Sequence, residues 1–175
     1  MKVKRWLVAL KKIVPTEMER YLEEMAAEGY QLKSVGEMGL FYFEFDETEN
    51  KKSKYVVDIS ALPKVSYMET LLKKEWEYLG RTGNCYIWRK NYEDKRPEDF
   101  ADKICRKKHC FRLGLIFALF AVLIGILMCG LGWGIMFELR QGVKDHILAY
   151  GIEIILQIPF LIYFIWGARK LLAER

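Results

Sequence analysis

Hydrophobic residues fill two uninterrupted runs in the last third of the chain, Leu113 to Phe137 and Ile147 to Ala168. At a rise of about 1.5 Å per residue, these runs of 25 and 22 residues form helices of roughly 38 and 33 Å. Such lengths are enough to cross a hydrocarbon core of about 30 Å. The pattern therefore predicts two transmembrane helices, over residues 113–137 and 147–168, joined by a short external loop over residues 138–146.

The first 92 residues instead alternate between strand and helix patterns, in an order that occurs twice. The first unit is expected to contain a strand over Val3 to Leu10, a helix over residues 15–29, and a hairpin of Tyr30 to Val35 and Leu40 to Phe45 that turns at Gly36 to Gly39. The second unit is expected to contain a strand over Tyr55 to Ser60, a helix after Pro63, and a hairpin of Trp76 to Arg81 and Cys85 to Lys90 that turns at Gly83-Asn84. This order indicates an internal repeat.

Two capping-box patterns are consistent with the repeat. Thr16 with Glu19, and Ser66 with Glu69, each place a hydroxyl and a carboxylate where they can satisfy free amide groups of a first helical turn. The caps are 50 residues apart, whereas the hairpins that begin at Tyr30 and Trp76 are 46 residues apart. A second helix that is shorter by about one turn explains both spacings.

We therefore expect an α+β fold for residues 1–92, in which two strand-helix-strand-strand units share a core and the helices lie on one face of a mainly antiparallel sheet. This arrangement resembles the duplicated strand-helix-strand-strand modules of bacterial effector-binding domains, such as the ligand-sensing half of multidrug regulators. A ferredoxin-like topology that lacks one short strand is the alternative. Residues 93–112 are expected to form a charged juxtamembrane linker or helix, and residues 169–175 a tail.

The charges are distributed unevenly along the chain. Residues 1–100 hold 18 Lys+Arg and 18 Asp+Glu, so the net charge of +5 comes from residues 101–175, which hold 10 basic and 5 acidic side chains. The basic residues flank the predicted spans: Lys103, Arg106, Lys107, Lys108 and Arg112 precede the first, and Arg169, Lys170 and Arg175 follow the second. By the positive-inside rule, we expect a multi-pass protein of the bacterial inner membrane with both termini in the cytoplasm. The neutral first half argues against direct nucleic-acid binding.

Sequence signatures of an enzyme are missing. His109 and His146 are the only two histidines, so a Ser-His-Asp set cannot form within the first 92 residues. Cys105, His109 and Cys110 have no second pair at ligand spacing, and we therefore expect no metal and no cofactor. The best-placed acid-base alternative is a pair of carboxylates, Asp58 and Glu44, on neighbouring strands. We expect a protein that is not an enzyme, with an unrecognised enzyme as an alternative.

Aromatic residues are the leading candidates for binding. Tyr42 is expected on the outer face of its strand, and Tyr86 and Trp88 share one face of the last strand. Together with Trp6 and Trp76, they would form an amphipathic surface suited to an apolar small molecule or a partner helix. The alternative is that the helices cover this face.

Two features of the predicted spans suggest specific contacts. Glu153 requires a partner in lipid, and Gln157 lies one turn further along the same helix. We expect Glu153 to reach the outer interface or to bond another helix, with a proton or ion pathway as the alternative. Gly130 and Gly134 have the spacing that allows close helix approach, either within the hairpin or in a homo-oligomer.

Several segments are similar to the bacterial family catalogued as domain of unknown function 2812. They are the Trp6 strand, the helix end Glu23 to Tyr30, the aromatic strand Phe41 to Phe45, and Trp76 to Tyr78 with Tyr86 to Trp88. The resemblance covers about residues 1–95, and many relatives also have a two-span tail. The family has no assigned activity, but its members are often encoded beside PadR-type transcription regulators. The resemblance thus implies a membrane-tethered partner or sensor of such a regulator.

We interpret the chain as a non-enzymatic, membrane-anchored binding or sensor module. Its partners would be the lipid bilayer and either a PadR-type regulator or an apolar small molecule bound by the cytoplasmic domain. An accessory subunit of a larger membrane complex, in which the spans make the specific contacts, is the alternative.

Overall fold

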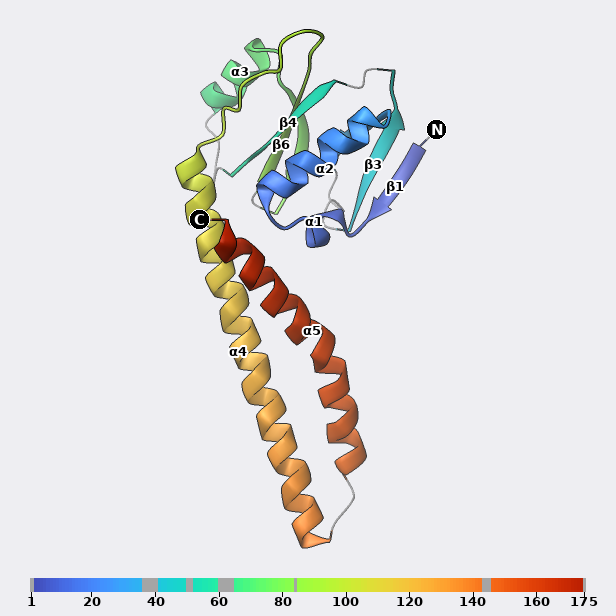
Figure 1. The fold of residues 1–175 in the computed structure, drawn as a ribbon, viewed down its shortest axis with the longest axis vertical. Helices are drawn as coiled ribbons and strands as arrows, with labels where there is room; N and C mark the ends of the chain where they lie inside the picture. The colour runs from blue at the N-terminus through green and yellow to red at the C-terminus, as the bar shows by residue number, and fades with distance from the viewer. Residues whose placement is uncertain are drawn as a thin grey trace. The chain divides into compact units, whose positions relative to one another are not determined.

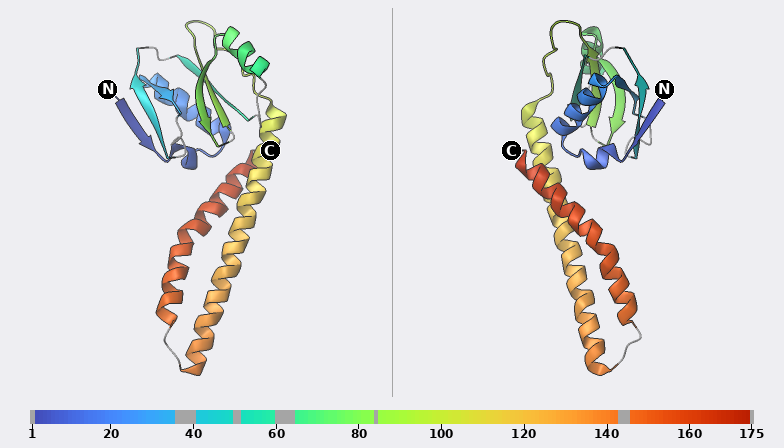
Figure 2. Two further views of the ribbon diagram at one scale, coloured as in Figure 1. Left: turned by 180° about the vertical axis from the view of Figure 1, so that it is seen from behind. Right: turned by 45° about the vertical axis from the view of Figure 1, so that its right-hand side comes forward.

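The computed structural model describes residues 2–35, 41–49, 52–59, 65–83, 85–142 and 146–174. It divides into two compact units, Met1–His109 and Cys110–Arg175, which we call the α+β domain and the helical hairpin. Every described strand lies in the α+β domain, as Figures 1 and 2 show. The predicted turn over residues 36–39, Pro63 and Asn84 lie outside the described residues.

Each repeat forms a three-stranded antiparallel sheet. The first repeat contains β1 (Lys2–Trp6), α2 (Pro15–Ala27), β2 (Tyr30–Ser34) and β3 (Tyr42–Glu47), with the strand order β1-β3-β2. The second repeat contains β4 (Ser53–Asp58), α3 (Val65–Lys73), β5 (Glu77–Thr82) and β6 (Cys85–Asn91), with the strand order β4-β6-β5. The two strand orders are equivalent, because the first strand of each repeat pairs with the third. This equivalence confirms the predicted α+β duplication and both hairpins.

The start of the first repeat differs from the prediction. The first strand ends at Trp6, because Leu7 adopts a left-handed conformation with φ of 59° and the one-turn helix α1 (Val8–Lys11) follows. Helix α2 begins at Pro15, whose fixed φ suits a first helical position, and Val14 is its N-cap. Thr16 therefore lies inside the helix, and the predicted capping box with Glu19 is wrong. Ser66 likewise lies inside α3.

A shared core confirms that neither repeat folds around its own residues alone. Met18, Leu22 and Met25 on α2 pack with side chains from both sheets. The other members of this core are Val8, Ala26, Leu32, Val35, Phe43, Phe45, Tyr55, Val57, Leu79 and Ile87. Helix α2 thus covers one face of each sheet.

The second sheet is covered on both faces. Tyr55 and Val57 of β4 face the core beneath α2, whereas Val56 packs with Leu71 of α3 and Trp88 of β6 on the opposite face. The two helices therefore lie on opposite faces of this sheet, and the prediction of helices on one face is wrong. The apolar centre of β4, residues 55–57, is what a strand buried on both sides requires. The polar ends of the strand, Ser53, Lys54 and Asp58, are buried as well.

Side chains of α2 also accept hydrogen bonds from two backbone amides of β4. The Glu19 carboxylate accepts the amide of Val57 at 2.6 Å, and the Glu23 carboxylate accepts the amide of Tyr55 at 3.4 Å. These two glutamates are four residues apart and lie on one side of the helix. Helix α2 therefore completes the hydrogen bonding of a strand that has a neighbouring strand, β6, on only one side among the described residues.

Among the described residues, one backbone bridge joins the two sheets. Val35 donates its amide to the carbonyl of Leu79 at 2.5 Å and forms a parallel bridge with Gly80. Gly80 has φ of +126°, and a Cβ at this position would lie 2.1 Å from the Val35 carbonyl oxygen. Only glycine allows the backbones to approach this closely.

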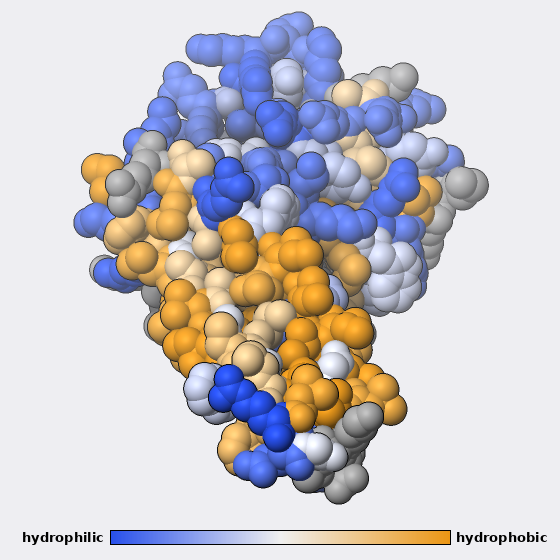
Figure 3. All heavy atoms as spheres, turned by 60° about the horizontal axis from the view of Figure 1, so that its bottom comes forward, coloured by the Kyte–Doolittle hydropathy of each residue, from blue (hydrophilic) through white to orange (hydrophobic). Residues whose placement is uncertain are grey.

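The helical hairpin contains α5 (Ile147–Ala173) and all of α4 (Lys103–Gln141) except its first residues, 103–109, which belong to the α+β domain. Both helices are long and apolar enough to cross a membrane. Their outer surface is largely apolar, as Figure 3 shows. Helix α4 already begins within the segment 93–112, where the Asp102 carboxylate accepts the amides of Ile104 and Cys105. The aromatic rings of Phe117 and Phe164 pack between the two helices, with centroids 5.2 Å apart.

Candidate functional site

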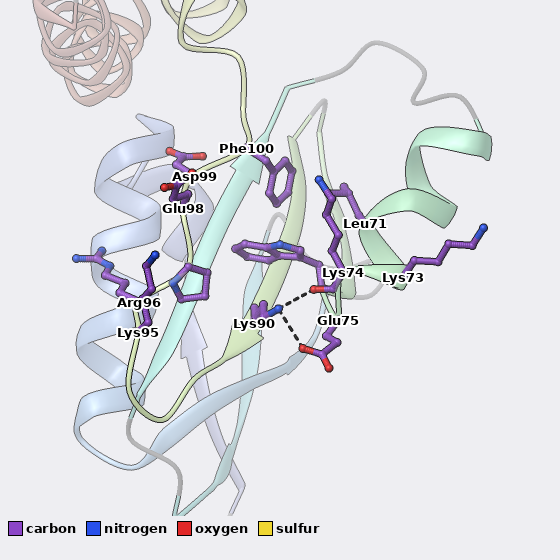
Figure 4. A pocket seen from close by; sticks show the side chains of 12 residues that line it. Leu71, Lys73, Lys74, Glu75, Lys90, Lys95, Arg96, Glu98, Asp99 and Phe100 are labelled. Atoms are coloured by element: carbon purple, nitrogen blue, oxygen red, sulfur yellow. Dashed lines mark hydrogen bonds and ion pairs between the residues drawn. The ribbon is translucent and has the colours of Figure 1, made fainter.

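A groove of about 660 Å³ lies on the α+β domain, as Figure 4 shows. One wall is the end of α3 with the turn that follows it, formed by Leu71, residues 73–76 and Lys90 of β6. The other wall is the irregular segment over residues 95–100, which precedes α4. The groove thus lies between the second repeat and the chain that leads to the first apolar helix.

Aromatic rings form the apolar part of the groove. The rings of Trp76 and Phe100 meet edge to face, with centroids 4.8 Å apart. Phe100 also lies against Trp88 and Tyr67, at 6.3 and 6.4 Å. It contributes with α3 to a cluster that buries the outer face of the second sheet, leaving Tyr86 only 8% exposed.

Cationic side chains surround the aromatic rings. The groove is lined by the basic residues Lys73, Lys74, Lys90, Lys95 and Arg96 and by the acidic residues Glu75, Glu98 and Asp99. The Lys90 ammonium donates to the Lys74 carbonyl at 2.7 Å and to the Glu75 carboxylate at 3.1 Å. Glu75 has φ of 64°, a left-handed conformation in the turn after α3. Among the described residues, Glu75 pairs with Lys90, Asp99 with Arg106, and Arg96 with Glu23. The groove residues outside these pairs are Lys73, Lys74 and Lys95 against Glu98, so the rim favours an anion.

A buried ion cluster fixes the second wall of the groove to α2. The Arg106 guanidinium lies 3.2 Å from the Asp99 carboxylate and also pairs with the Glu19 carboxylate. Burial raises the pKa of Glu19, and the Arg106 charge and the Val57 amide oppose this rise. A second contact, between Arg96 and Glu23 at 2.7 Å, fixes the other end of the segment. Residues 96–106 are thus held against one helix at two points.

The predicted carboxylate pair does not form. Glu44 lies in the first sheet and pairs with Lys4 at 3.1 Å, whereas Asp58 lies in the second sheet and accepts the Tyr67 hydroxyl at 3.3 Å. Burial raises the pKa of Asp58, while burial and the neighbouring carboxylate raise the pKa of Tyr67 to about 12. Among the described residues, no group of three or more His, Cys, Asp or Glu side chains could hold a metal ion.

The predicted aromatic surface is divided between the two sheets. Trp76, Tyr86 and Trp88 are buried beneath α3 and Phe100. In contrast, Trp6 is 62% exposed on the first sheet, where its ring lies 5.3 Å from that of Tyr42. The prediction that these five aromatic residues form one surface is therefore wrong, because they lie on two different sheets and those on the second sheet are buried.

The candidate residues of the spans differ in their surroundings. Glu153 is exposed on α5, and the buried side-chain oxygen of Gln157 has no hydrogen-bond donor among the described residues. A Cβ on Gly134 would lie 3.2 Å from the Tyr150 ring of α5, whereas Gly130 has nothing within 4 Å. Only Gly134 of this pair lies at a close helix contact.

Sequence reasoning missed the wall formed by residues 95–100, because the segment was interpreted as part of a charged juxtamembrane region. The available signal was the presence of Pro97 and Phe100 within a charged stretch. It also missed the role of Arg106, which was counted among the cations that flank the first span. Nothing in the local pattern connects Arg106 to Glu19, which lies 87 residues earlier.

Comparison with known proteins identifies a family but no characterised relative. Neither the curated proteins nor the solved structures searched gave a match to this chain. The family described as "Protein of unknown function (DUF2812)" matches residues 15–122, which extend from the start of α2 through the groove and into α4. This match covers more than half of the chain, and the chain therefore belongs to the DUF2812 family.

Proposed function

We propose that this chain is a non-enzymatic, membrane-anchored binding module, and that the groove over Trp76 and Phe100 binds an apolar small molecule with an acidic group. The observation that supports the proposal is an aromatic lining within a cationic rim. A volume of about 660 Å³ is in the range of small-molecule sites. Contact with Phe100, and with the small exposed part of Trp76, would provide most of the affinity, since exposed ion pairs contribute only about 0–1 kcal/mol each.

The groove is also suited to report binding. Residues 95–100 would contact the bound molecule directly, and α4 begins at Lys103 after only two further residues. The ion pairs of Asp99 and Arg106 connect this wall to the first turns of α4. A ligand that binds one arrangement of the segment more tightly than another would shift the population of those arrangements.

In this proposal, α4 and α5 anchor the protein in the bacterial inner membrane, with both termini in the cytoplasm. This orientation is supported by the basic residues that precede the first apolar stretch and follow the second. A PadR-type regulator is the partner that the family resemblance implies. Retention of the regulator by the full-length protein in detergent extract, with and without added lipid, would test that partner.

The groove can be tested with 2-naphthoate as an aromatic anion and 2-naphthylmethanol as its neutral counterpart. Binding to the full-length protein in nanodiscs would be measured by calorimetry, with empty nanodiscs as the blank. We expect saturable binding of the naphthoate and at least about fivefold weaker binding of the alcohol, which is about 1 kcal/mol. The double variant Lys74→Gln/Lys95→Gln should lose this preference.

The matched control is the double variant Lys11→Gln/Lys33→Gln, which removes two exposed lysines away from the groove. It should bind the naphthoate as the unmodified protein does. Equal affinity for the two probes, or equal loss in the groove and control variants, would contradict the proposed site.

A further inference from the structure

Apolar side chains are exposed together at one end of the first sheet. Trp6 is 62% exposed, Leu7 40% and Phe41 50%. The Leu7 amide donates to the Phe41 carbonyl at 2.5 Å, and Trp6 is the register partner of Tyr42. These contacts make the four residues contiguous, and we call them the Trp6 patch. Helix α2 packs on the opposite face of this sheet, where Phe43 and Phe45 are buried.

Basic side chains accompany the Trp6 patch. Residues 3–12 contain Lys4, Arg5, Lys11 and Lys12 and no acidic residue. The Lys4 ammonium lies 4.7 Å from the centre of the Tyr42 ring and pairs with Glu44, the one acidic residue of residues 41–44. Lys11 is one turn from Leu7, to whose carbonyl its amide donates. Arg5 is the register partner of the buried Phe43, and the Lys12 ammonium lies 5.7 Å from the Tyr21 ring of α2, so both lie toward α2. After the Lys4–Glu44 pair, Lys11 therefore supplies the positive charge beside the patch.

We propose that the Trp6 patch docks on the surface of an anionic lipid bilayer. An exposed Trp with Leu, Phe and Tyr beside cations is the combination that favours the headgroup region, where the indole keeps one end wet and the cations meet lipid phosphates. A bilayer is also within reach, because the same chain continues into two helices long enough to cross one. Because helices in the membrane would hold the α+β domain near the bilayer, its effective concentration at the lipid surface is high. Even a weak contact would then be formed for much of the time.

This inference concerns a different part of the domain from the groove and uses none of its residues. It would give the α+β domain two states, one docked on lipid and one released. Because the patch includes both β1 and the start of β3, docking would hold the first sheet rather than the second. Failure of naphthoate binding would therefore leave the docking inference unaffected, and the reverse also holds.

The test measures the fluorescence of Trp6 in nanodiscs that contain brominated lipids, which quench tryptophan only at short range. The full-length protein would be placed in phosphatidylcholine discs with and without phosphatidylglycerol, and the emission of the Trp6→Phe variant would be subtracted. We expect the Trp6 emission to be largely lost with phosphatidylglycerol. The docked fraction should be at least about fivefold larger than without it and should fall as salt is added.

A second variant provides the matched control. Leu72 is 55% exposed on α3, and α3 and β1 lie on opposite sides of the α+β domain in Figure 1. A tryptophan introduced there, in Trp6→Phe/Leu72→Trp, should keep its emission in the same discs. Equal quenching at the two positions, or an unquenched Trp6 with phosphatidylglycerol, would overturn the inference. Quenching of Trp6 emission that requires two protein copies in a disc would identify a second copy as the occupant and would also overturn it.

Discussion

Glu19 and Arg106 form a buried ion pair across 87 residues of sequence, with side chains that are only 8% and 9% exposed. The same carboxylate accepts the Val57 amide of β4. One side chain of α2 therefore contacts both the edge of the second sheet and the first turns of α4. The Glu19–Arg106 pair therefore links α2 of the first repeat to residues 95–100, the segment that forms one wall of the groove.

Removal of the arginine should destabilise the α+β domain, because Glu19 would remain as a buried charge without its partner. We expect Arg106→Gln to lower the free energy of unfolding by about 3 kcal/mol, and Glu19→Gln/Arg106→Gln to recover part of that loss. Urea unfolding of the full-length protein in mild detergent, followed by tryptophan emission, measures both. The exposed neighbour Lys107→Gln is the control, and an unchanged midpoint for Arg106→Gln would contradict the link.

The backbone bridge between Val35 and Gly80 predicts that substitutions at two glycines will have unequal effects on stability. Both Gly80 and Gly83 have positive φ, but only Gly80 faces a neighbouring backbone, that of Val35. Gly83→Ala should cost about 1 kcal/mol, the cost of a left-handed non-glycine residue. Gly80→Ala should cost about 3 kcal/mol, because the Val35 carbonyl must move and the bridge is lost. Equal losses in urea unfolding would show that the close approach is unimportant.

Asp58 should make the stability of the domain dependent on pH. Burial raises its pKa above the ordinary 3.8, so the folded state holds this proton more tightly than the unfolded state does. The free energy of unfolding should therefore fall as pH rises from about 4 through the raised pKa. Asp58→Asn should make this fall shallower, and the remaining fall should come from Glu19, whose pKa burial also raises.

Tyr67→Phe provides the complementary variant for that pH profile. The Tyr67 hydroxyl stabilises the Asp58 carboxylate, and its loss should raise the pKa of Asp58 further. The fall in stability should then extend to higher pH. Identical profiles for the unmodified protein and Asp58→Asn would rule out Asp58 as the source of the pH dependence.

The two glycines of α4 should separate contacts within the hairpin from contacts between copies. Gly134→Val places its side chain against Tyr150, whereas Gly130→Val meets open space. Since both variants carry the same helix-propensity cost, the extra loss for Gly134→Val should be about 1–3 kcal/mol. Thermal unfolding in detergent measures this difference. If Gly130 instead contacts a second copy, Gly130→Val should reduce chemical cross-linking between chains in lipid.

The pattern of apolar and polar residues along the chain predicted those helices and strands that are set by neighbouring residues alone. The alternation in Tyr30–Ser34 and Tyr42–Glu47 and the apolar stretches of α4 and α5 were sufficient to identify those elements. The predicted boundaries were wrong where two local preferences favoured different ends of the same helix or strand. Pro15 sets the start of α2 ahead of the Thr16 hydroxyl, and the left-handed Leu7 ends a strand whose apolar pattern continues to Leu10.

The groove could not be predicted, because its walls come from segments distant in sequence. Phe100 is brought to Trp76 by ion pairs whose partners lie on α2, and no periodicity encodes those pairs. The burial of Trp88 depends on the same segment. The charged composition of residues 95–100 suggested a solvated linker, whereas in the structure the segment packs against the α+β domain.

The carboxylates of Glu19 and Glu23 also bear on how crowded copies of this protein behave. If the proposed membrane anchoring holds, the copies share one plane and collide often, and bare strand edges under such crowding favour amyloid-like growth. In the second sheet, an incoming strand would have to displace both glutamates from the amides of Tyr55 and Val57 and leave Arg106 without its main partner. The ion pairs that hold the groove wall therefore also protect this side of the domain from self-templated aggregation.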